Sequence, residues 1–325
     1  MNDRFRTEEL DKLPSMDALI AAIGERNMTP GWIPRPNSSV RMKEMRSAFV
    51  PAHWRYADAK LAMQSAGRLI ATEQAERRNF IMRNPVPANA DATLRTLVCA
   101  YQSILPGEKA RSHRHSPHAL RVILESRGSY SIVDGEKTPM ETGDVVLTPG
   151  WSWHGHGHEG NEQAYWLDGL DVPLTEQLEP MFFEEHPDGW QPVHTATEVS
   201  PMRFAWADTL AALQRAAADA AGHFGATIEL AAPTMPSIAL KMHRWPALWR
   251  SRPYRHAANT VYVVMQGSGS STIGEHRFDW AFGDAIAAPA WSRIEHRAGE
   301  EAVMFSMSDE NLMRWTRYYR FESMN

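Results

Sequence analysis

Hydrophobic and polar positions change their pattern about a third of the way along the chain. Leu19, Ile20 and Ile23 follow Ser15 at helical spacing, and a second stretch of helical spacing covers roughly residues 57–78. From Thr96 onward the apolar runs have strand length and are bounded by Gly, Pro and Asp, as in ALRVIL, YSIV and DVVLTP. We therefore expect helices and proline-rich loops first, and a protein that is dominated by β-structure overall.

The β pattern is interrupted once. Residues 173–201 are rich in Pro, Glu and His, which is typical of a linker, and an alanine-rich helix is expected at about residues 209–221. The pattern predicts four segments. They are an N-terminal helical and loop region (1–95), a β domain (96–172), a linker with a helix (173–225) and a second β domain with the C-terminal segment (226–325).

The two β domains repeat one another. The stretch from Gly143-Asp144 to Trp151-Ser152 matches the stretch from Gly283-Asp284 to Trp291-Ser292 without a gap. Further upstream and downstream, His113-Arg114-His115 aligns with Tyr254-Arg255-His256, Arg121 with Tyr262, and His154 with Ile294. Duplication of a β module is the simplest explanation of this repeat.

Composition and charge indicate which classes of protein this chain can belong to. The 325 residues are 43% hydrophobic, which is enough for a substantial core. The formal net charge of -5 comes without a long run of one sign, so we expect no nucleic-acid or membrane partner. No apolar stretch approaches a membrane span or the core of a secretory signal, and we expect a cytoplasmic location. The single cysteine, Cys99, lies in an apolar run and is expected to fill the core.

A candidate metal site lies in the first β domain. His113 and His115 alternate along a predicted strand, so both imidazoles point to the same face. His154 follows the Gly143 block, and a second strand can bring it across to complete a group of three histidines. Such a group suits iron, zinc, copper or manganese, and this chemistry alone does not choose among them.

The simpler explanation is a cluster of surface histidines, because His118, His156 and His158 lie close by in the sequence. The spacing of the pair and the altered second copy argue against it. Tyr254 and Ile294 take the places of two of the three histidines, and isoleucine cannot bind a metal. We predict one metal site, in the first β domain.

These motifs are similar to those of a known family. Gly107 followed by His113-Arg114-His115, and Gly143 followed by Pro149 and His154, resemble the two cupin motifs, although the glutamate of the first motif is absent. The segments HRHSPHALR, GDVVLTPGWSWHGHG, WLDGLD and RFDWAFGD resemble the gentisate 1,2-dioxygenase family, which includes salicylate, 1-hydroxy-2-naphthoate and 5-nitrosalicylate 1,2-dioxygenases. The similarity covers nearly the whole chain.

This resemblance implies a fold, a cofactor and a reaction. The fold would be a bicupin, with two jelly-roll β-barrels after an N-terminal helical region. The cofactor would be Fe(II), held by three histidines. The substrates would be O2 and a small aromatic acid such as gentisate, salicylate or a 5-substituted salicylate. The ring would open between the carboxyl-bearing and hydroxyl-bearing carbons, and the protein would be a homotetramer.

The resemblance also assigns roles to side chains around the metal. Arg121 lies six residues after His115 and would share its strand face, where its guanidinium would pair with the substrate carboxylate. Arg77 matches a second anion-binding position, with a solvated helix face as its alternative. His156 would be a hydrogen-bond partner or proton carrier in catalysis, with a supporting or surface role as its alternative.

Three more positions match the lining of the family pocket. Gln102 and Asp168 would contact the substrate, although polar groups at such positions also brace strands and turns. Val98 stands where members of the family carry Trp, so the pocket would be larger and would admit a group at the 5-position of the ring, unless a neighbour fills the space.

A second class of function remains open. A cupin barrel also suits a protein that binds a small ligand without oxidising it, or a metal-dependent isomerase or hydrolase. Arg121 and Arg77 beside a site of histidines favour an anionic aromatic chelator. Oxygen uptake with iron present would discriminate between the two classes.

Overall fold

The computed structural model describes residues 7–33, 44–71 and 78–324, and the chain divides into two compact units. The smaller unit, Met1–Glu44, contains the 3-10 helix η1 (Thr7–Lys12) and the helix α1 (Met16–Gly24). Helix α1 begins after Ser15, whose hydroxyl accepts a hydrogen bond from the backbone N–H of Ala18 at 3.2 Å. The apolar spacing predicted this helix.

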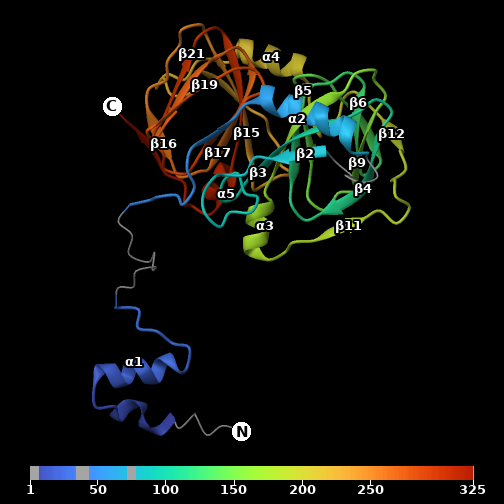
Figure 1. Ribbon diagram of the computed structural model, residues 1–325. Helices are drawn as coiled ribbons and strands as arrows, with labels where there is room; N and C mark the ends of the chain where they lie inside the picture. Colours follow the sequence, from blue (N-terminus) through green and yellow to red (C-terminus); the bar gives the residue numbers. More distant parts are fainter. Residues whose placement is uncertain (1–6, 34–43, 72–77, 325) are drawn as a thin grey trace. The chain divides into compact units, whose positions relative to one another are not determined.

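The larger unit, Met45–Asn325, contains two β-barrels side by side (Figure 1). The first barrel is built from two sheets with the strand orders β13-β8-β5-β10-β3-β2 and β11-β4-β9-β6-β7-β12. Its strands are β2 (Arg78–Ile81), β3 (Val98–Ile104), β4 (Lys109–His115), β5 (Ala119–Glu125), β6 (Ser129–Val133), β7 (Glu136–Met140), β8 (Val145–Thr148), β9 (His154–His158), β10 (Ala164–Leu170), β11 (Phe183–Glu185), β12 (Thr195–Ala196) and β13 (Arg203–Phe204).

The second barrel has the strand orders β1-β20-β17-β22-β15-β14 and β19-β18-β21-β16-β23. Its strands are β1 (Ala52–Trp54), β14 (Ala226–Glu229), β15 (Ala239–Trp245), β16 (Tyr254–His256), β17 (Thr260–Gln266), β18 (Gly269–Ile273), β19 (His276–Trp280), β20 (Ala285–Ala288), β21 (Ile294–Ala298), β22 (Ala302–Ser308) and β23 (Phe321–Ser323). Strands β15 to β22 repeat the order and pairing of β3 to β10. The fold is a mostly β bicupin, as predicted.

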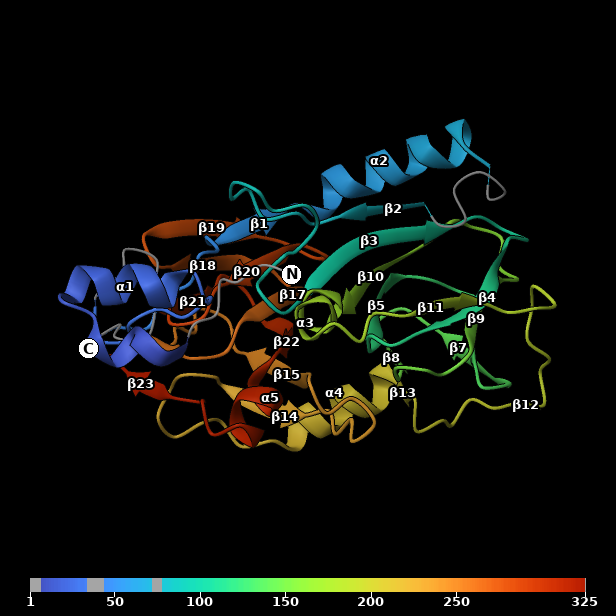
Figure 2. The same cartoon turned by 90° about the horizontal axis from the view of Figure 1, so that it is seen from below.

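Short helices connect and cover the barrels. They are α2 (Tyr56–Leu69), α3 (Val172–Leu178), α4 (Trp206–Arg215) and α5 (Glu310–Trp315). Figure 2 shows α2 lying along β2 and β3. Several details differ from the sequence predictions. Helix α2 ends at Leu69 because Ile70 is extended, and α4 ends at Arg215 rather than near residue 221 because Ala216 is extended. Residues before 95 also contribute the strands β1 and β2, and the predicted linker contributes β11, β12 and β13. Among the described residues, no helix is long and apolar enough to cross a membrane.

The barrels exchange short segments. Strand β1, which precedes the first barrel in the sequence, pairs with β20 of the second barrel, and β13 pairs with β8 of the first. A carboxylate fixes the helix that follows each exchanged strand. Asp284 accepts the N–H of Tyr56 at 2.8 Å, and Asp144 accepts the N–H of Trp206 at 2.9 Å. Each repeat therefore consists of a strand, a helix and a barrel, and its strand pairs with the barrel of the other repeat.

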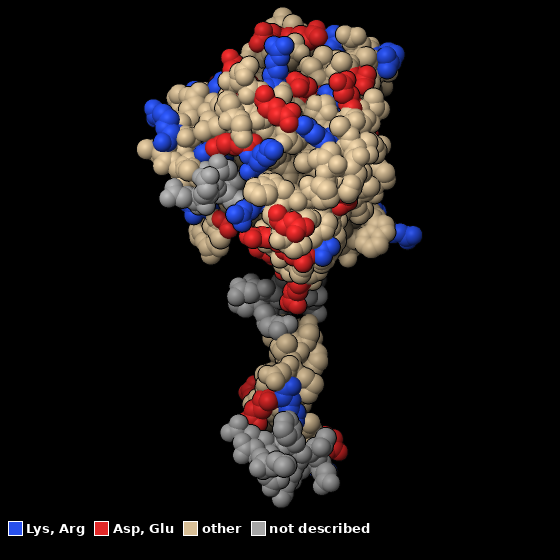
Figure 3. Space-filling model, turned by 90° about the vertical axis from the view of Figure 1, so that its right-hand side faces the viewer, with Lys and Arg blue, Asp and Glu red and all other residues tan. Residues whose placement is uncertain are grey.

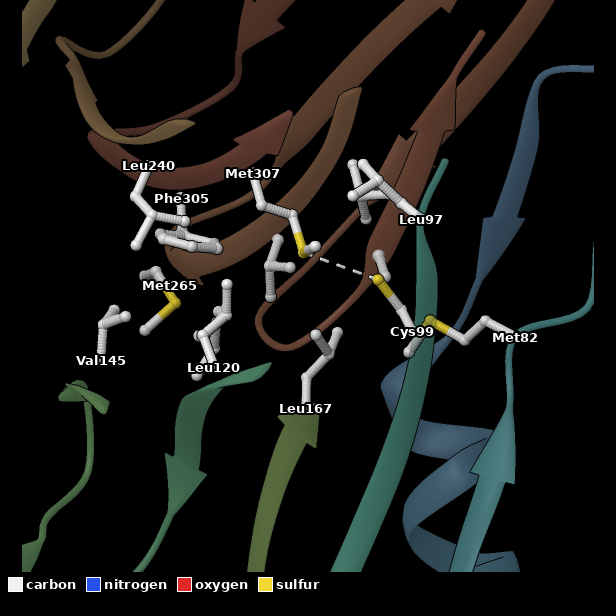
Figure 4. Close-up of a cluster of buried hydrophobic side chains, with 14 of the residues drawn as sticks. Met82, Leu97, Cys99, Leu120, Val145, Leu167, Leu240, Met265, Phe305 and Met307 are labelled. Carbon is white, nitrogen blue, oxygen red and sulfur yellow. Dashed lines mark hydrogen bonds between the residues drawn. The ribbon is translucent and has the colours of Figure 1, made fainter. Parts of the chain in front are cut away.

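The barrels pack back to back through a shared hydrophobic core. Leu120 and Leu167 of the first barrel lie against Met265, Phe305 and Met307 of the second, and all five are buried (Figure 4). Strands at this interface are covered on both faces, by the barrel interior and by the other barrel. This is why ALRVIL and DVVLTP are nearly continuous apolar runs rather than alternating ones.

Charge on the larger unit is dispersed. The face in Figure 3 shows acidic and basic side chains interspersed, with no broad area of one sign. This agrees with the small formal net charge of -5. An anionic substrate must therefore meet its positive charge inside a site rather than on this face.

Candidate metal centre

Three histidines converge inside the first barrel. His113 and His115 lie on β4, His154 begins β9, and His113 faces His154 directly in the strand register. One ring nitrogen from each lies within 4.8 Å of the others. The side chains are at most 8% exposed. Among the described residues, no other group of three histidines, cysteines or acidic residues meets this criterion.

Hydrogen bonds determine which nitrogen of each ring is available to bind a metal. The Nδ1 atom of each histidine contacts a backbone carbonyl oxygen, which can only accept a hydrogen bond. The partners are Arg111 (3.2 Å from His113), Pro117 (2.8 Å from His115) and Ser152 (3.0 Å from His154). In the neutral imidazole, each Nδ1 therefore carries the proton and each Nε2 keeps a lone pair. Three neutral imidazoles with this orientation fit a divalent transition metal.

Arg121 faces the interior of the same barrel from the opposite sheet. It lies on β5, is 2% exposed, and its Nη1 donates to the hydroxyl of Thr148 at 2.6 Å. Its Nε lies 3.4 Å from a carboxylate oxygen of Asp168. The prediction that Arg121 shares a strand with His115 is wrong, because the chain leaves β4 at His115 and begins β5 at Ala119. Its inward orientation comes from the alternation of β5.

Asp168 links Arg121 to a buried tryptophan. It lies on β10 directly opposite Arg121, is 6% exposed, and accepts a hydrogen bond from Nε1 of Trp166 at 3.0 Å. The sequence interpretation named Asp168 but missed its contact with Trp166 and the contact of Arg121 with Thr148. Strand alternation would have placed Trp166 on the face of Asp168, since the two are two positions apart on β10, whereas the contact of Thr148 depends on the pairing of β8 with β5.

His156 lies between the histidines and this polar group. It is 3% exposed on β9, and its ring centroid is 6.1 Å from that of His154 and 6.1 Å from that of Trp166. Contacts therefore run from the three histidines through His156 and Trp166 to Asp168 and Arg121. All of these groups belong to the interior of one barrel.

Gln102 and Val98 lie on β3, where alternate residues face the same interior. Gln102 is 3% exposed and stands opposite Trp166, and among the described residues no group donates to its Oε1. Val98 is 8% exposed at the beginning of the strand, opposite Leu170. The alternation places both side chains on the face shared with Trp166.

The predicted residue Arg77 lies outside the described residues. Its neighbour Arg78 is buried and forms a two-point ion pair with Glu108, with nitrogen-to-oxygen distances of 2.6 and 2.7 Å. This pair ties β2 to the beginning of β4, so Arg78 is committed to a structural contact.

The corresponding place in the second barrel is filled by aromatic side chains. Tyr254 faces Ile294 in the register that joins His113 to His154 in the first barrel. The hydroxyl of Tyr254 lies 3.0 Å from that of Tyr262, and Nδ1 of His296 lies 2.7 Å from the hydroxyl of Ser271. Burial lowers the pKa of His296 to about 3, so this histidine stays neutral. No three-histidine group exists here.

The fold and the site together define a bicupin with a three-histidine metal centre in its first barrel. Residues 100–170 match the cupin domain family. The chain is 32% identical to the 5-aminosalicylate 1,2-dioxygenase of a Comamonas species over 98% of this chain and 91% of that protein. It is 31% identical to gentisate 1,2 dioxygenase 1 of Aquipseudomonas alcaligenes over 86% of this chain and 88% of that protein.

A solved structure shows the same fold. The salicylate 1,2-dioxygenase of Pseudoaminobacter salicylatoxidans, as adducts with gentisate, superposes with a TM-score of 0.86 and 25% identity over 97% of this chain and 95% of that chain. The chain belongs to the gentisate 1,2-dioxygenase family. It is a ring-cleaving dioxygenase for salicylate-like acids, which sets aside the alternative of a cupin that binds a ligand without oxidising it.

Proposed function

We propose that this enzyme uses iron(II) and O2 to open the ring of a salicylate-like acid that carries a group at the 5-position. Gentisate, 5-aminosalicylate and 5-nitrosalicylate are such acids, and unsubstituted salicylate is the reference. The bond that breaks joins the carboxyl-bearing and hydroxyl-bearing carbons, and both atoms of one O2 enter the product. The observation that carries the proposal is the convergence of three imidazoles, each with its Nδ1 against a backbone carbonyl oxygen.

The donor set fits iron(II), the metal that the family resemblance implies. A site of three imidazoles without a carboxylate or thiolate suits an ion that also accepts oxygen ligands from a substrate. When bound, iron(II) would supply a common binding point for the aromatic acid and O2 and a path for electrons from one to the other. His113, His115 and His154 would hold it.

Arg121 would bind the substrate carboxylate. Thr148 and Asp168 brace two of its nitrogen atoms, so the guanidinium enters the barrel with a fixed direction. A fixed fork loses little side-chain entropy when it pairs with a carboxylate, and the pairing is strong in a buried site. Arg121 would therefore orient the ring so that the carboxyl and the ortho-hydroxyl face the three histidines.

Polar side chains beside the ring would complete the site. His156, two positions beyond His154, would exchange a proton with the ortho-hydroxyl or with the reacting oxygen. Gln102 and Asp168 would line the pocket opposite, with Asp168 acting mainly through Arg121. Arg77, outside the described residues, is proposed as a second contact for the carboxylate.

Val98 would determine how large a group the pocket accepts on the ring of the substrate. A valine where the resembled family carries tryptophan would leave space on the interior face of β3. The similarity to a 5-aminosalicylate 1,2-dioxygenase over nearly the whole chain supports a group at the 5-position. We propose that this group lies beside Val98.

The arrangement of segments also supports different roles for the two barrels. We propose that residues 96–172 form the catalytic domain and residues 226–325 a metal-free domain that supports it, joined by residues 173–225 after the N-terminal region 1–95. We further propose a homotetramer. The exposure of Trp151, Phe182 and Phe183 beside β4 supports an association surface.

Oxygen consumption tests the proposal. Iron-loaded enzyme would be given gentisate, salicylate, 5-aminosalicylate or 5-nitrosalicylate, with 3-hydroxybenzoate as a control that lacks the ortho-hydroxyl. We expect uptake of one O2 per ring opened with at least one 5-substituted salicylate, faster than with salicylate, and none with the control. No uptake with any of the four acids, by protein shown to contain iron, would refute the proposal.

A further inference from the structure

The loops that follow β4 in the first barrel and β16 in the second differ in the hydrogen bond at Nδ1 of the histidine that ends each strand. In the first barrel, Nδ1 of His115 lies 2.8 Å from the carbonyl oxygen of Pro117. In the second barrel, Nδ1 of His256 accepts a hydrogen bond from the N–H of Ala258 at 3.2 Å. Pro117 and Ala258 occupy the same position of the repeat.

The two loops share the backbone contacts that hold them in place. The residue after the Pro or Ala, His118 or Asn259, donates its N–H to a carboxylate, and its side chain accepts a backbone N–H. The matching contacts are His118 to Asp171 (2.7 Å) and Asn259 to Asp309 (2.8 Å), and Gly150 to His118 (2.9 Å) and Ala290 to Asn259 (3.2 Å). The histidine carbonyl accepts from Trp151 in one barrel and Trp291 in the other, both at 2.7 Å. The difference at Nδ1 is therefore local.

Proline explains the difference, because it has no backbone N–H to donate. A neutral histidine carries its proton on one nitrogen only, and the hydrogen bond at Nδ1 decides which. Against the N–H of Ala258, Nδ1 of His256 must accept, so the proton sits on Nε2. Against the carbonyl of Pro117, Nδ1 of His115 must donate, so Nε2 keeps the lone pair that a metal needs.

We propose that Pro117 is a positioning residue for the metal centre, because it selects the metal-binding tautomer of His115. The neighbouring N–H of His118 cannot replace the missing donor, since Asp171 holds it. Asp171 also accepts a hydrogen bond from Ser237, so a residue between β14 and β15 of the second barrel helps to hold this loop. The second barrel has lost the selection together with two metal ligands, and its His256 is neutral because burial lowers its pKa to about 4.

The Pro117→Ala variant tests the proposal, since it restores the N–H that Ala258 provides in the second barrel. We expect His115 to carry its proton on Nε2 in the metal-free protein, as read from long-range proton–nitrogen NMR spectra of labelled histidines. The dissociation constant for Fe(II), measured anaerobically against a chromophoric chelator, should rise about 10- to 100-fold, the usual effect of losing a partner that orients a metal ligand.

Ala258→Pro is the matched control. It should move the proton of His256 from Nε2 to Nδ1 and leave the affinity for Fe(II) unchanged, and it tests the rule even if Pro117→Ala does not fold. An unchanged His115 tautomer in Pro117→Ala, or an unchanged His256 tautomer in Ala258→Pro, would overturn the proposal, as would wild-type iron affinity in Pro117→Ala. The iron measurement rests on the proposed function. Failure of the wild-type protein to bind iron would refute that function, and the tautomers would still be read in the metal-free protein.

Discussion

Replacement of Arg121 separates its two roles, in stability and in substrate binding. The Arg121→Met variant leaves the Asp168 carboxylate, which is 6% exposed, without the guanidinium beside it. Loss of one member of a buried ion pair costs about 3–5 kcal/mol of folding free energy. The loss of a charge-assisted contact to the substrate carboxylate costs about 1.5–3 kcal/mol, or roughly a 10- to 100-fold lower kcat/KM.

A double variant tells the two losses apart. In Arg121→Met with Asp168→Asn, no unpaired charge remains, so we expect urea unfolding to recover most of the lost free energy. Oxygen uptake should not recover, because the carboxylate-binding group is still missing. Tyr262→Phe is the control at the equivalent position of the second barrel and should leave kcat/KM unchanged, since it removes only the contact with Tyr254. Recovery of kcat/KM in the double variant would show that Arg121 acts only through the fold.

Three further predictions follow from the packing. Val98→Trp should lower kcat/KM for a 5-substituted salicylate by roughly tenfold or more while affecting salicylate less, measured by oxygen uptake, because the added rings fill the proposed space. Burial lowers the pKa of His243, which lies on β15, and of His296 to about 3, and that of His256 to about 4. These values lie below the pKa of an unfolded histidine, so the unfolded chain binds protons first as the pH falls. Stability should therefore be complete above about pH 6.5 and fall at lower pH by up to about 1.4 kcal/mol per pH unit for each histidine, seen as a falling urea midpoint. Burial raises the pKa of the Cys99 thiol to about 12, so a thiol reagent should modify it only after denaturation, and rapid labelling of the native protein would contradict the packing.

Much of the metal centre was predictable from the sequence because it depends on periodicity within single strands. His113 and His115 share a face by alternation, and the repeat showed that the second copy has Tyr254 and Ile294 in place of two ligands. Contacts that depend on register between distant strands were not predictable, and the contact of Thr148 with Arg121 belongs to this class. The exchanged strands β1 and β13 span three and two residues, too few for any periodicity to show.

The orientation of His115 shows a second limit of prediction from the sequence alone. The motif HRHSPHALR contains Pro117, but its meaning emerges only when the two loops are compared as hydrogen-bonded structures. The exchange of strands between the barrels also emerges only from this comparison. Asp144 and Asp284 each accept a hydrogen bond from the first turn of a helix, and the strand before that helix pairs with the barrel that contains the aspartate. These two features occur at matching positions of the repeat.

The iron content of variants tests the central claim, that a single barrel holds the metal. Protein loaded anaerobically with Fe(II) and freed of excess would be assayed for iron per chain and for folding by circular dichroism. We predict one iron per chain in the wild-type protein and in Tyr254→Phe, and none in folded His154→Ala. Two irons per chain in the wild-type protein, or iron retained by His154→Ala, would contradict the account.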